Sequence, residues 1–82
     1  MDDIYQAFAA INEELGFAQK KFPPFHSAHE GWAIIFEEVM ELWEVVKEKQ
    51  STPGRSDRLQ KEAIQVAAMA LRFLMDMPSF KN

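Results

Sequence analysis

Carboxylates gather at two places in this chain at a spacing that could bind a metal ion. Glu38 and Glu41 belong to the acidic run EEVME at 37–41, and Glu62 is followed three residues later by Gln65. Residues three and four apart lie on neighbouring parts of one helix face, so each pair can direct its oxygens at one point. Oxygen ligands that converge from two helices suit a hard divalent cation, Mg²⁺ or Mn²⁺, and such a cation suits a phosphate-bearing substrate.

A solvated helix face is the alternative interpretation of these glutamates. Glu44 and Glu48 fit it, since Lys47 and Lys49 lie beside them in the sequence. The glutamates at 37, 41, 44 and 48 nevertheless follow one another at helical spacing. Like charges at this spacing destabilise an isolated helix by about 0.2–0.5 kcal/mol per pair. A bound cation would relieve that repulsion, so the density of negative charge favours a metal site.

The first element expected to support the site is a helix from about Asp2 to Lys20. Asp2 or Asp3 is suited to be its N-cap, and Pro23-Pro24 must end it. Apolar residues recur along one face of this segment at helical spacing: Ile4, Phe8, Ile11, Leu15 and Ala18.

The second helix, which carries the acidic run, is expected from about Ser27 to Gln50. Ser27 followed by Glu30 resembles a capping box. The expected buried stripe of this helix consists of Trp32, Ile35, Val39, Leu42 and Val46, widened by Phe36 and Trp43.

A turn signal at Ser51-Thr52-Pro53-Gly54 and a net basic loop from Arg55 to Lys61 lead to a third helix, expected from about Asp57 to Met77. Between residues 63 and 74 only Gln65 and Arg72 are polar. A helix that is apolar on nearly every side must be covered on nearly every side, which two partner helices cannot easily do. A second subunit across a two-fold axis is therefore expected to cover it.

These elements predict one all-α domain over residues 1–82. It is a small helical bundle of three main helices, with the second and third antiparallel, completed by oligomerisation to a homodimer or homotetramer. No apolar run reaches the roughly 18 residues that a membrane span needs, and the acidic first residues do not fit a secretory signal. The lack of cysteine excludes disulfides and thiolate zinc sites and fits a reducing compartment, so a cytoplasmic protein is expected. A net charge of −4 argues against nucleic-acid binding.

The order of these motifs resembles the MazG-like all-α nucleoside triphosphate pyrophosphohydrolases, the group related to dCTP and dUTP pyrophosphatases. Glu-Glu-x-x-Glu at 37–41 matches the first half of the family pattern, and Glu62-x-x-Gln65 matches the second half at an acceptable separation. The lead-in FPPFHSAHEG at 22–31 also looks like that of small MazG-like proteins. The resemblance covers roughly residues 22–76.

By this resemblance, Glu38, Glu41 and Glu62 are metal ligands with Gln65 in the fourth place, and Glu37 binds a further ion or orients water. The reaction implied is hydrolysis of an NTP or dNTP, between the α and β phosphates, to the monophosphate and pyrophosphate. It depends on Mg²⁺, or Mn²⁺, which clamps phosphate oxygens and lowers the pKa of the attacking water. A free carboxylate, from Glu37 or Glu38, would accept that water's proton.

The family pattern has Asp where this chain has Gln65. The amide offers a neutral oxygen, removes one negative charge and cannot act as a base, so metal affinity is expected to fall. Gln65 could also be only a polar residue at a helix interface. Two alternatives to the enzyme therefore stay open: a catalytically weakened module that binds nucleotide or metal, and a helical assembly protein whose acidic face keeps it soluble.

The remaining candidates concern the substrate. Arg55, Arg58 and Lys61 could contact phosphate, with an ordinary solvated loop as the alternative. His29, or His26, could reach a base or phosphate; with Glu30 the two histidines lack a third ligand for zinc. Trp43, Trp32 and Phe36 could stack on a nucleobase, although aromatic residues at helical spacing more often belong to a core.

Overall fold

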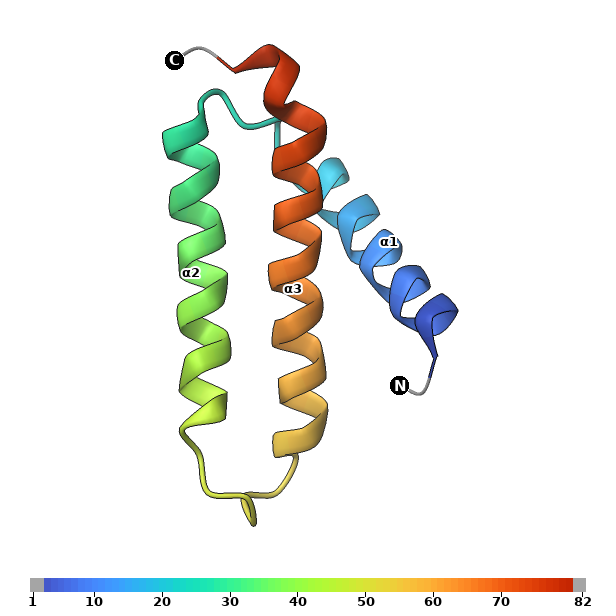
Figure 1. Ribbon diagram of the computed structural model, residues 1–82, viewed down its shortest axis with the longest axis vertical. Coiled ribbons are helices and arrows are strands. Elements are labelled where there is room, and N and C mark those ends of the chain that lie inside the picture. The colour runs from blue at the N-terminus through green and yellow to red at the C-terminus, as the bar shows by residue number, and fades with distance from the viewer. Residues whose placement is uncertain (1–2, 81–82) are drawn as a thin grey trace.

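Three α-helices build the structure, a computed structural model that describes residues 3–80. They are α1 (Ile4–Lys21), α2 (Ala28–Val46) and α3 (Arg55–Asp76), followed by a short 3-10 helix, η1 (Met77–Ser79) (Figure 1). Residues 3–80 contain no strand. The prediction of an all-α fold with three main helices is therefore confirmed.

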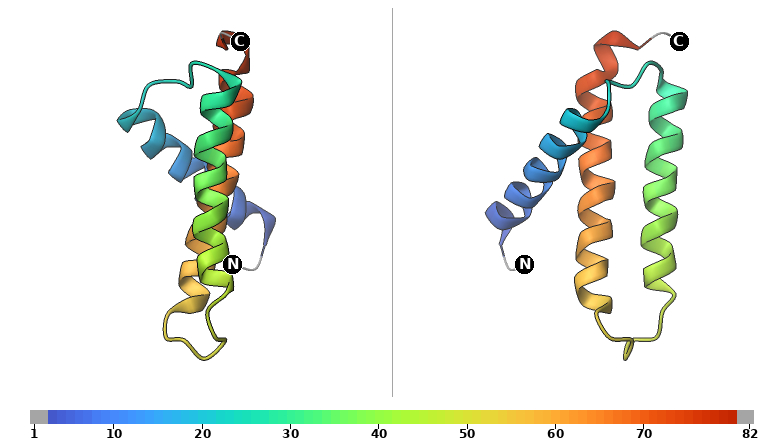
Figure 2. Two further views of the ribbon diagram at one scale, coloured as in Figure 1. Left: turned by 90° about the vertical axis from the view of Figure 1, so that its left-hand side faces the viewer. Right: turned by 180° about the vertical axis from the view of Figure 1, so that it is seen from behind.

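The helices α2 and α3 form an antiparallel hairpin, as expected, and α1 crosses α3 obliquely on one side of it (Figures 1 and 2). The contacts of α1 are made with α3, so α3 lies between its two neighbours. One broad side of the hairpin is consequently left without a helix against it, as the two further views make clear (Figure 2).

Helix α1 begins and ends where the sequence indicates. The carboxylate of Asp3 accepts a hydrogen bond of 2.9 Å from the backbone N–H of Gln6, which confirms Asp3 as the N-cap. Asp2, the other candidate, lies outside the described residues. Lys20 and Lys21 occupy the last turn, where cations interact favourably with the helix dipole, and the two prolines follow.

Helix α2 begins at the predicted cap and ends earlier than expected. Ser27 Oγ accepts from the backbone N–H of Glu30 at 3.0 Å, whereas the Glu30 carboxylate accepts from the N–H of His26 rather than closing a capping box on Ser27. The expected end at Gln50 is wrong. The Arg55 guanidinium donates to the carbonyls of Val45 and Val46, and so satisfies acceptors at the end of a helix that stops at Val46.

Helix α3 begins two residues earlier than expected, and this corrects the prediction of a basic loop from Arg55 to Lys61. These residues form the first two turns of the helix. Gly54 precedes it with φ of 75°, in the left-handed region that glycine adopts without steric cost. The helix ends at Asp76, and Pro78 lies in the following 3-10 turn.

The core lies where α1, the 22–25 segment and α3 meet. Ala18, Phe25, Ala68 and Met69 are buried there, and Ile11, Ile34, Ile35, Phe73 and Phe80 pack around them. Gly31 allows α2 to approach closely, because a Cβ at this position would lie 2.5 Å from the Phe73 ring. Near the N-terminus of α1, Ile4 and Phe8 remain exposed, contrary to the stripe predicted for this helix.

The stripe predicted to be buried on α2 is largely exposed in the single chain. Gly31, Glu38, Leu42 and Val45 are buried or half-buried, and so are Ile34 and Ile35. The exposed residues of the predicted stripe are Trp32, Phe36, Val39, Trp43 and Val46. The physical reason is that α1 packs on α3 and leaves this side of α2 without a partner.

Arg72 and Asp76 fasten the 22–25 segment to α3. The Arg72 guanidinium lies 4.2 Å from the centre of the Phe25 ring and donates to the carbonyl of Pro23. Asp76 accepts a 2.9 Å hydrogen bond from the Phe25 backbone N–H and lies 3.8 Å from Arg72. Both side chains are nearly buried, so this pair orients the connection between α1 and α2.

None of the helices within residues 3–80 has the combined length and apolar character that crossing a membrane requires.

Candidate metal centre

Glu38, Glu41 and Glu62 come together across the α2–α3 hairpin. One carboxylate oxygen from each lies within 4.8 Å of those of the other two. Glu38 and Glu41 stand one turn apart on α2, and Glu62 reaches them from the second turn of α3. The spacing and the antiparallel pairing expected from the sequence therefore produce a three-carboxylate cluster.

The surroundings of the cluster favour a neutral carboxyl at its centre when no cation is present. Burial raises the pKa of Glu38 to about 7 from 4.5, with further contributions from the charge of Glu41, a hydrogen bond with it, and the charges of Glu62 and Glu37. Burial also raises the pKa of Glu62, and Glu41 adds to this effect while Lys61 opposes it. Carboxylates this close resist simultaneous ionisation unless a positive charge is added.

Glu62 supplies an independent indication that the cluster lacks a partner. Its Oε2 atom is buried and has no hydrogen-bond partner among the described residues. A buried, unsatisfied carboxylate oxygen is costly, and such atoms in folded proteins often contact an ion or water. The carboxylate oxygens of the three glutamates match the hard-oxygen chemistry of Mg²⁺ and Mn²⁺, so the residues fit the expected cation.

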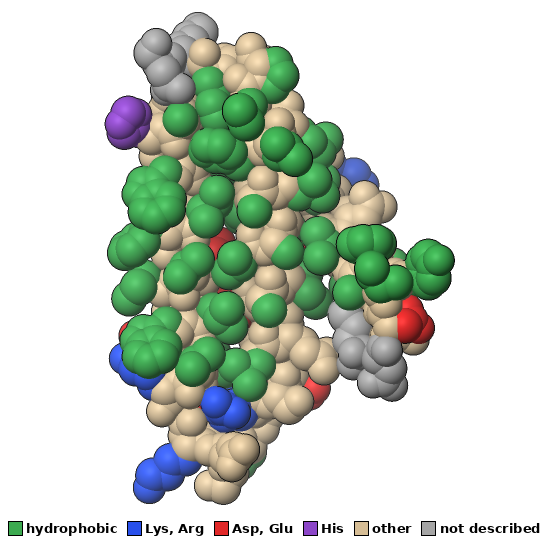
Figure 3. Space-filling model, viewed as in Figure 1, with side chains coloured by type: hydrophobic (Ala, Val, Ile, Leu, Met, Phe, Trp, Pro, Cys, Tyr) green, Lys and Arg blue, Asp and Glu red, His purple; other side chains and the backbone are tan. Residues whose placement is uncertain are grey.

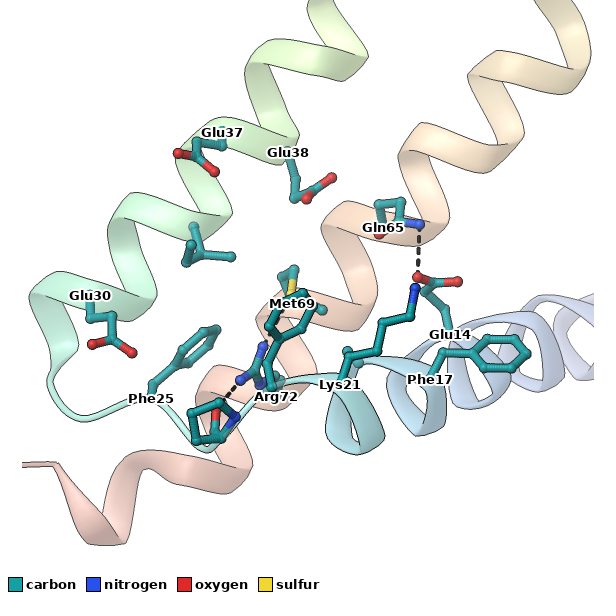
Figure 4. A pocket seen from close by; sticks show the side chains of 14 residues that line it. Glu14, Phe17, Lys21, Phe25, Glu30, Glu37, Glu38, Gln65, Met69 and Arg72 are labelled. Carbon is teal, nitrogen blue, oxygen red and sulfur yellow. Dashed lines mark hydrogen bonds between the residues drawn. The ribbon is translucent and has the colours of Figure 1, made fainter.

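A cleft of about 480 Å³ opens beside the cluster, between the C-terminal half of α1 and the two helices of the hairpin. Glu38 belongs to both the cluster and the cleft wall, and Figure 4 shows its carboxylate directed across the gap toward α3. Apolar residues, among them Phe17, Phe25 and Met69, also line the cleft. The cleft thus has both charged and apolar walls.

Gln65 lies on the cleft wall of α3, one turn after Glu62. Its amide nitrogen donates a 2.8 Å hydrogen bond to Glu14 of α1 (Figure 4). That bond fixes the side chain and uses only the amide nitrogen, so the carbonyl oxygen is the atom that Gln65 could offer to a cation. The residue is therefore partly an inter-helix contact, as the alternative interpretation of Gln65 proposed.

Glu37 is exposed beside the cluster and also lines the cleft. Its negative charge contributes to the raised pKa of Glu38, which places it within electrostatic reach of the cluster. Glu37 does not belong to the group of three converging oxygens. It is thus the neighbouring carboxylate that remains free when the other three bind a cation.

The arginines expected to contact phosphate have structural partners instead. Arg58 forms an ion pair with Glu48 and donates to the carbonyl of Pro53, while Arg55 binds the end of α2. The hydrogen bond from Arg58 lowers the pKa of Glu48, so Glu48 is not the free surface residue expected from the sequence. Lys61 is exposed next to Glu62 and remains a candidate for a phosphate contact.

His29 and Trp43 lie away from the cleft. His29 is exposed in the first turn of α2, and His26 stands 3.5 Å from the Glu30 carboxylate. Trp43 is half-exposed on the outer side of α2, where the Lys47 ammonium lies 5.9 Å from its ring. Neither His29 nor Trp43 contributes to the walls of the cleft.

Four charged residues of the cleft were not anticipated as residues of this site: Glu14, Lys21, Glu30 and Arg72. The sequence could have identified Arg72, because it is one of two polar residues in the apolar part of α3 and has Asp76 four residues later as a possible ion-pair partner. Glu14 and Lys21 could not have been identified in this way, since nothing in the α1 sequence indicates that this helix borders the cluster.

The chain matches no protein-family model, no curated protein and no solved structure.

Proposed function

We propose that this protein binds a divalent cation, Mg²⁺ or Mn²⁺, through Glu38, Glu41 and Glu62 and hydrolyses a nucleoside triphosphate to the monophosphate and pyrophosphate. The convergence of three carboxylate oxygens within 4.8 Å supports this proposal most directly. The unpartnered Oε2 of Glu62 and the raised pKa of Glu38 give it further support, since the first is a buried oxygen without a donor and the second reflects carboxylates that a cation would stabilise in their ionised form. The resemblance of EEVME and Glu62-x-x-Gln65 to the MazG-like pattern supplies the reaction.

A cation held there would neutralise charge on the phosphate oxygens and lower the pKa of the attacking water. The three ligands would then be occupied, and Glu37 is the adjacent carboxylate that can accept a proton from that water. Lys61 and Lys21 are the cations beside the cluster and in the cleft, and either can bind a phosphate oxygen. The apolar residues of the cleft wall, such as Phe25 and Met69, would contact the base of the nucleotide.

A metal- and nucleotide-binding module without turnover is the second candidate. The observation that favours it is that polar groups around the cluster already form hydrogen bonds or ion pairs within the protein. Gln65 stands in place of an acid and is bound to Glu14, and Arg58 is bound to Glu48. Fewer groups are thereby left to stabilise the negative charge of a phosphoryl transition state, although the three carboxylates still converge.

Release of pyrophosphate from a panel of nucleoside triphosphates, with Mg²⁺ or Mn²⁺, tests the enzyme proposal. The wild-type chain is compared with Glu38→Ala and with Glu44→Ala, a control on α2 whose carboxylate pairs with Lys47 at the surface. Metal-dependent release that is lost only in Glu38→Ala is the expected result. Folded protein that binds Mn²⁺ and nucleotide without releasing pyrophosphate would favour the binding module, and absence of Mn²⁺ binding would refute both.

A further inference from the structure

Glu14 and Gln65 connect α1 to the helix that carries Glu62. The Gln65 amide nitrogen donates to a Glu14 carboxylate oxygen at 2.8 Å, and both side chains are half-buried in the wall of the cleft. An ionised carboxylate accepts hydrogen bonds and has none to donate, so the part of the amide that faces Glu14 must be its NH₂ group. The hydrogen bond therefore determines the orientation of the Gln65 amide, and the carbonyl oxygen faces away from Glu14.

The carbonyl oxygen of Gln65 lies on the side of the carboxylate cluster. Gln65 follows Glu62 by one turn of α3, as Glu41 follows Glu38 on α2. Figure 4 shows the Glu38 carboxylate directed across the cleft toward α3, and the Gln65 nitrogen turned the other way, toward Glu14. A carbonyl oxygen is a suitable ligand for Mg²⁺ or Mn²⁺, so Gln65 can complement the three glutamates.

The polar groups beside the cluster come from α1 rather than from the broad side of the hairpin that has no helix against it. Figure 3 shows hydrophobic side chains over that side, with few acidic atoms visible on α2 and α3. Helix α1 instead packs on α3 and brings Glu14 and Lys21 to the wall of the cleft. A residue that orients Gln65 is therefore to be found on α1.

We propose that Glu14 is a positioning residue of the metal centre, which holds the Gln65 amide so that its carbonyl oxygen faces the cation bound by the three glutamates. This inference rests on the proposed cation site. The N–H of an amide becomes a stronger donor when its carbonyl oxygen binds a cation, so the two contacts of Gln65 strengthen each other. Because such coupling is reciprocal, cation binding also strengthens the attachment of α1 to α3.

The dissociation constant of Mn²⁺, measured from the electron paramagnetic resonance signal of the free ion, tests this role without turnover. Glu14→Ala is expected to weaken binding by about tenfold, the lower end of the usual effect of residues that orient metal ligands. Glu13→Ala is the matched control, because it removes the same charge from an exposed neighbour outside the cleft wall, and its Kd should stay within about twofold of the wild type. An unchanged Kd in Glu14→Ala would overturn the proposal.

A double-mutant cycle shows whether Glu14 acts through Gln65. The effect of Glu14→Ala on the Kd of Mn²⁺ is expected to fall to about twofold or less when Gln65→Ala is already present. An undiminished effect in that background would overturn the proposal, because Glu14 would then act through its own charge or as a direct ligand.

Ile11→Ala separates the orientation of the amide from the packing of α1. Ile11 packs against the core and lies outside the cleft wall, so its truncation loosens α1 and leaves the bond between Glu14 and Gln65 in place. The Kd of Mn²⁺ is expected to stay within about twofold of the wild type. A loss as large as that in Glu14→Ala would assign the effect to the packing of α1 and overturn the positioning role.

Nuclear magnetic resonance of the wild-type chain provides a measurement that does not depend on the variants folding. Saturation with Mg²⁺ is expected to shift the side-chain NH₂ resonances of Gln65. Those of Gln60, which is exposed on the same helix and lies outside the cleft wall, are the internal control and should keep their positions. Gln65 resonances that do not move would overturn the proposal.

A failure of the cation site itself gives a different pattern of results. A wild-type chain that binds no Mn²⁺, or a Glu38→Ala variant that binds it as the wild type does, would overturn the proposed function and with it the role of Glu14. Mn²⁺ binding that is lost in Glu38→Ala and unchanged in Glu14→Ala would overturn the role of Glu14 alone.

Discussion

Replacing Glu38 with Gln is predicted to stabilise the metal-free protein at alkaline pH and to weaken strongly its stabilisation by Mn²⁺. The pKa of Glu38 is raised to about 7 from 4.5, first by burial and then by the neighbouring carboxylates. Between these two values the folded state keeps a proton that the unfolded chain has released. The free energy of unfolding contributed by this group therefore falls as pH rises from 4.5 to about 7, and the loss is complete above that range.

The size of the effect follows from the shift. A change from 4.5 to about 7 corresponds to an upper bound of about 3 kcal/mol. The Glu38 side chain is only half-buried, and solvent screening weakens charge interactions at such a site, so about 1–2 kcal/mol is expected. Glu38→Gln is isosteric and stays neutral. It should exceed the wild type in stability by this amount at about pH 8 and by almost nothing at about pH 4.

Urea unfolding in EDTA, at one fixed protein concentration and at both pH values, measures this difference. Glu44→Gln is the control, because its side chain is exposed and pairs with Lys47 at the surface, and its stability should remain within about 0.5 kcal/mol of the wild type. Adding Mn²⁺ at a hundredfold excess over its Kd should stabilise the wild type by about 2.7 kcal/mol, and Glu38→Gln by far less. A Glu38→Gln protein that is less stable than the wild type at pH 8 in EDTA would refute the electrostatic reasoning.

Three further substitutions test other contacts by urea unfolding. Gln65→Asp removes the donor to Glu14 and sets a carboxylate near it, so a loss of about 1–2 kcal/mol is expected in EDTA; unchanged stability would show that this hydrogen bond does not join α1 to α3. Asp76→Ala leaves Arg72 nearly buried without its partner and should cost about 3 kcal/mol; a cost under about 0.5 kcal/mol would contradict the role given to the pair. Gly31→Ala brings a methyl group against the Phe73 ring and should cost about 1–3 kcal/mol, and a stabilised variant would disprove close packing of α2 on α3 there.

Local signals in the sequence were sufficient to predict the helices and the carboxylate cluster. The N-caps at Asp3 and Ser27 act within a few residues, and so do the prolines at 23 and 24. Their effects can therefore be predicted without knowledge of the tertiary structure. The convergence of Glu38, Glu41 and Glu62 needs only helical spacing and an antiparallel hairpin. Each of these features depends on short-range geometry.

The burial of α2 could not be predicted in the same way. This helix has an aromatic side, which includes Trp32 and Phe36, and another side with Gly31, Glu38 and Val45. Hydrophobicity alone favours the aromatic side as the one that faces the core. The structure buries the other side, because α3 packs against it and α1 adds no cover to the aromatic side.

The partners of the arginines also depend on the tertiary structure. Arg55 and Arg58 looked like phosphate ligands because they precede Glu62 in a basic segment. In the structure, Arg55 donates to the carbonyls at the end of α2, and Arg58 forms an ion pair with the Glu48 carboxylate. These acceptors come close only after the 47–54 connection has folded. The contribution of Glu14 to the cleft likewise follows from the crossing of α1 over α3, and no motif in α1 predicts it.

Location of Mn²⁺ by anomalous diffraction, from crystals grown with and without MnCl₂, tests the central claim most directly. The predicted result is an anomalous peak between the carboxylates of Glu38, Glu41 and Glu62, within coordination distance of an oxygen from each. The same crystals of Glu62→Gln should lose the peak or show it much weakened. The absence of a peak in the wild type, or a peak only at another acidic site, would contradict the assignment of this cluster as a metal centre.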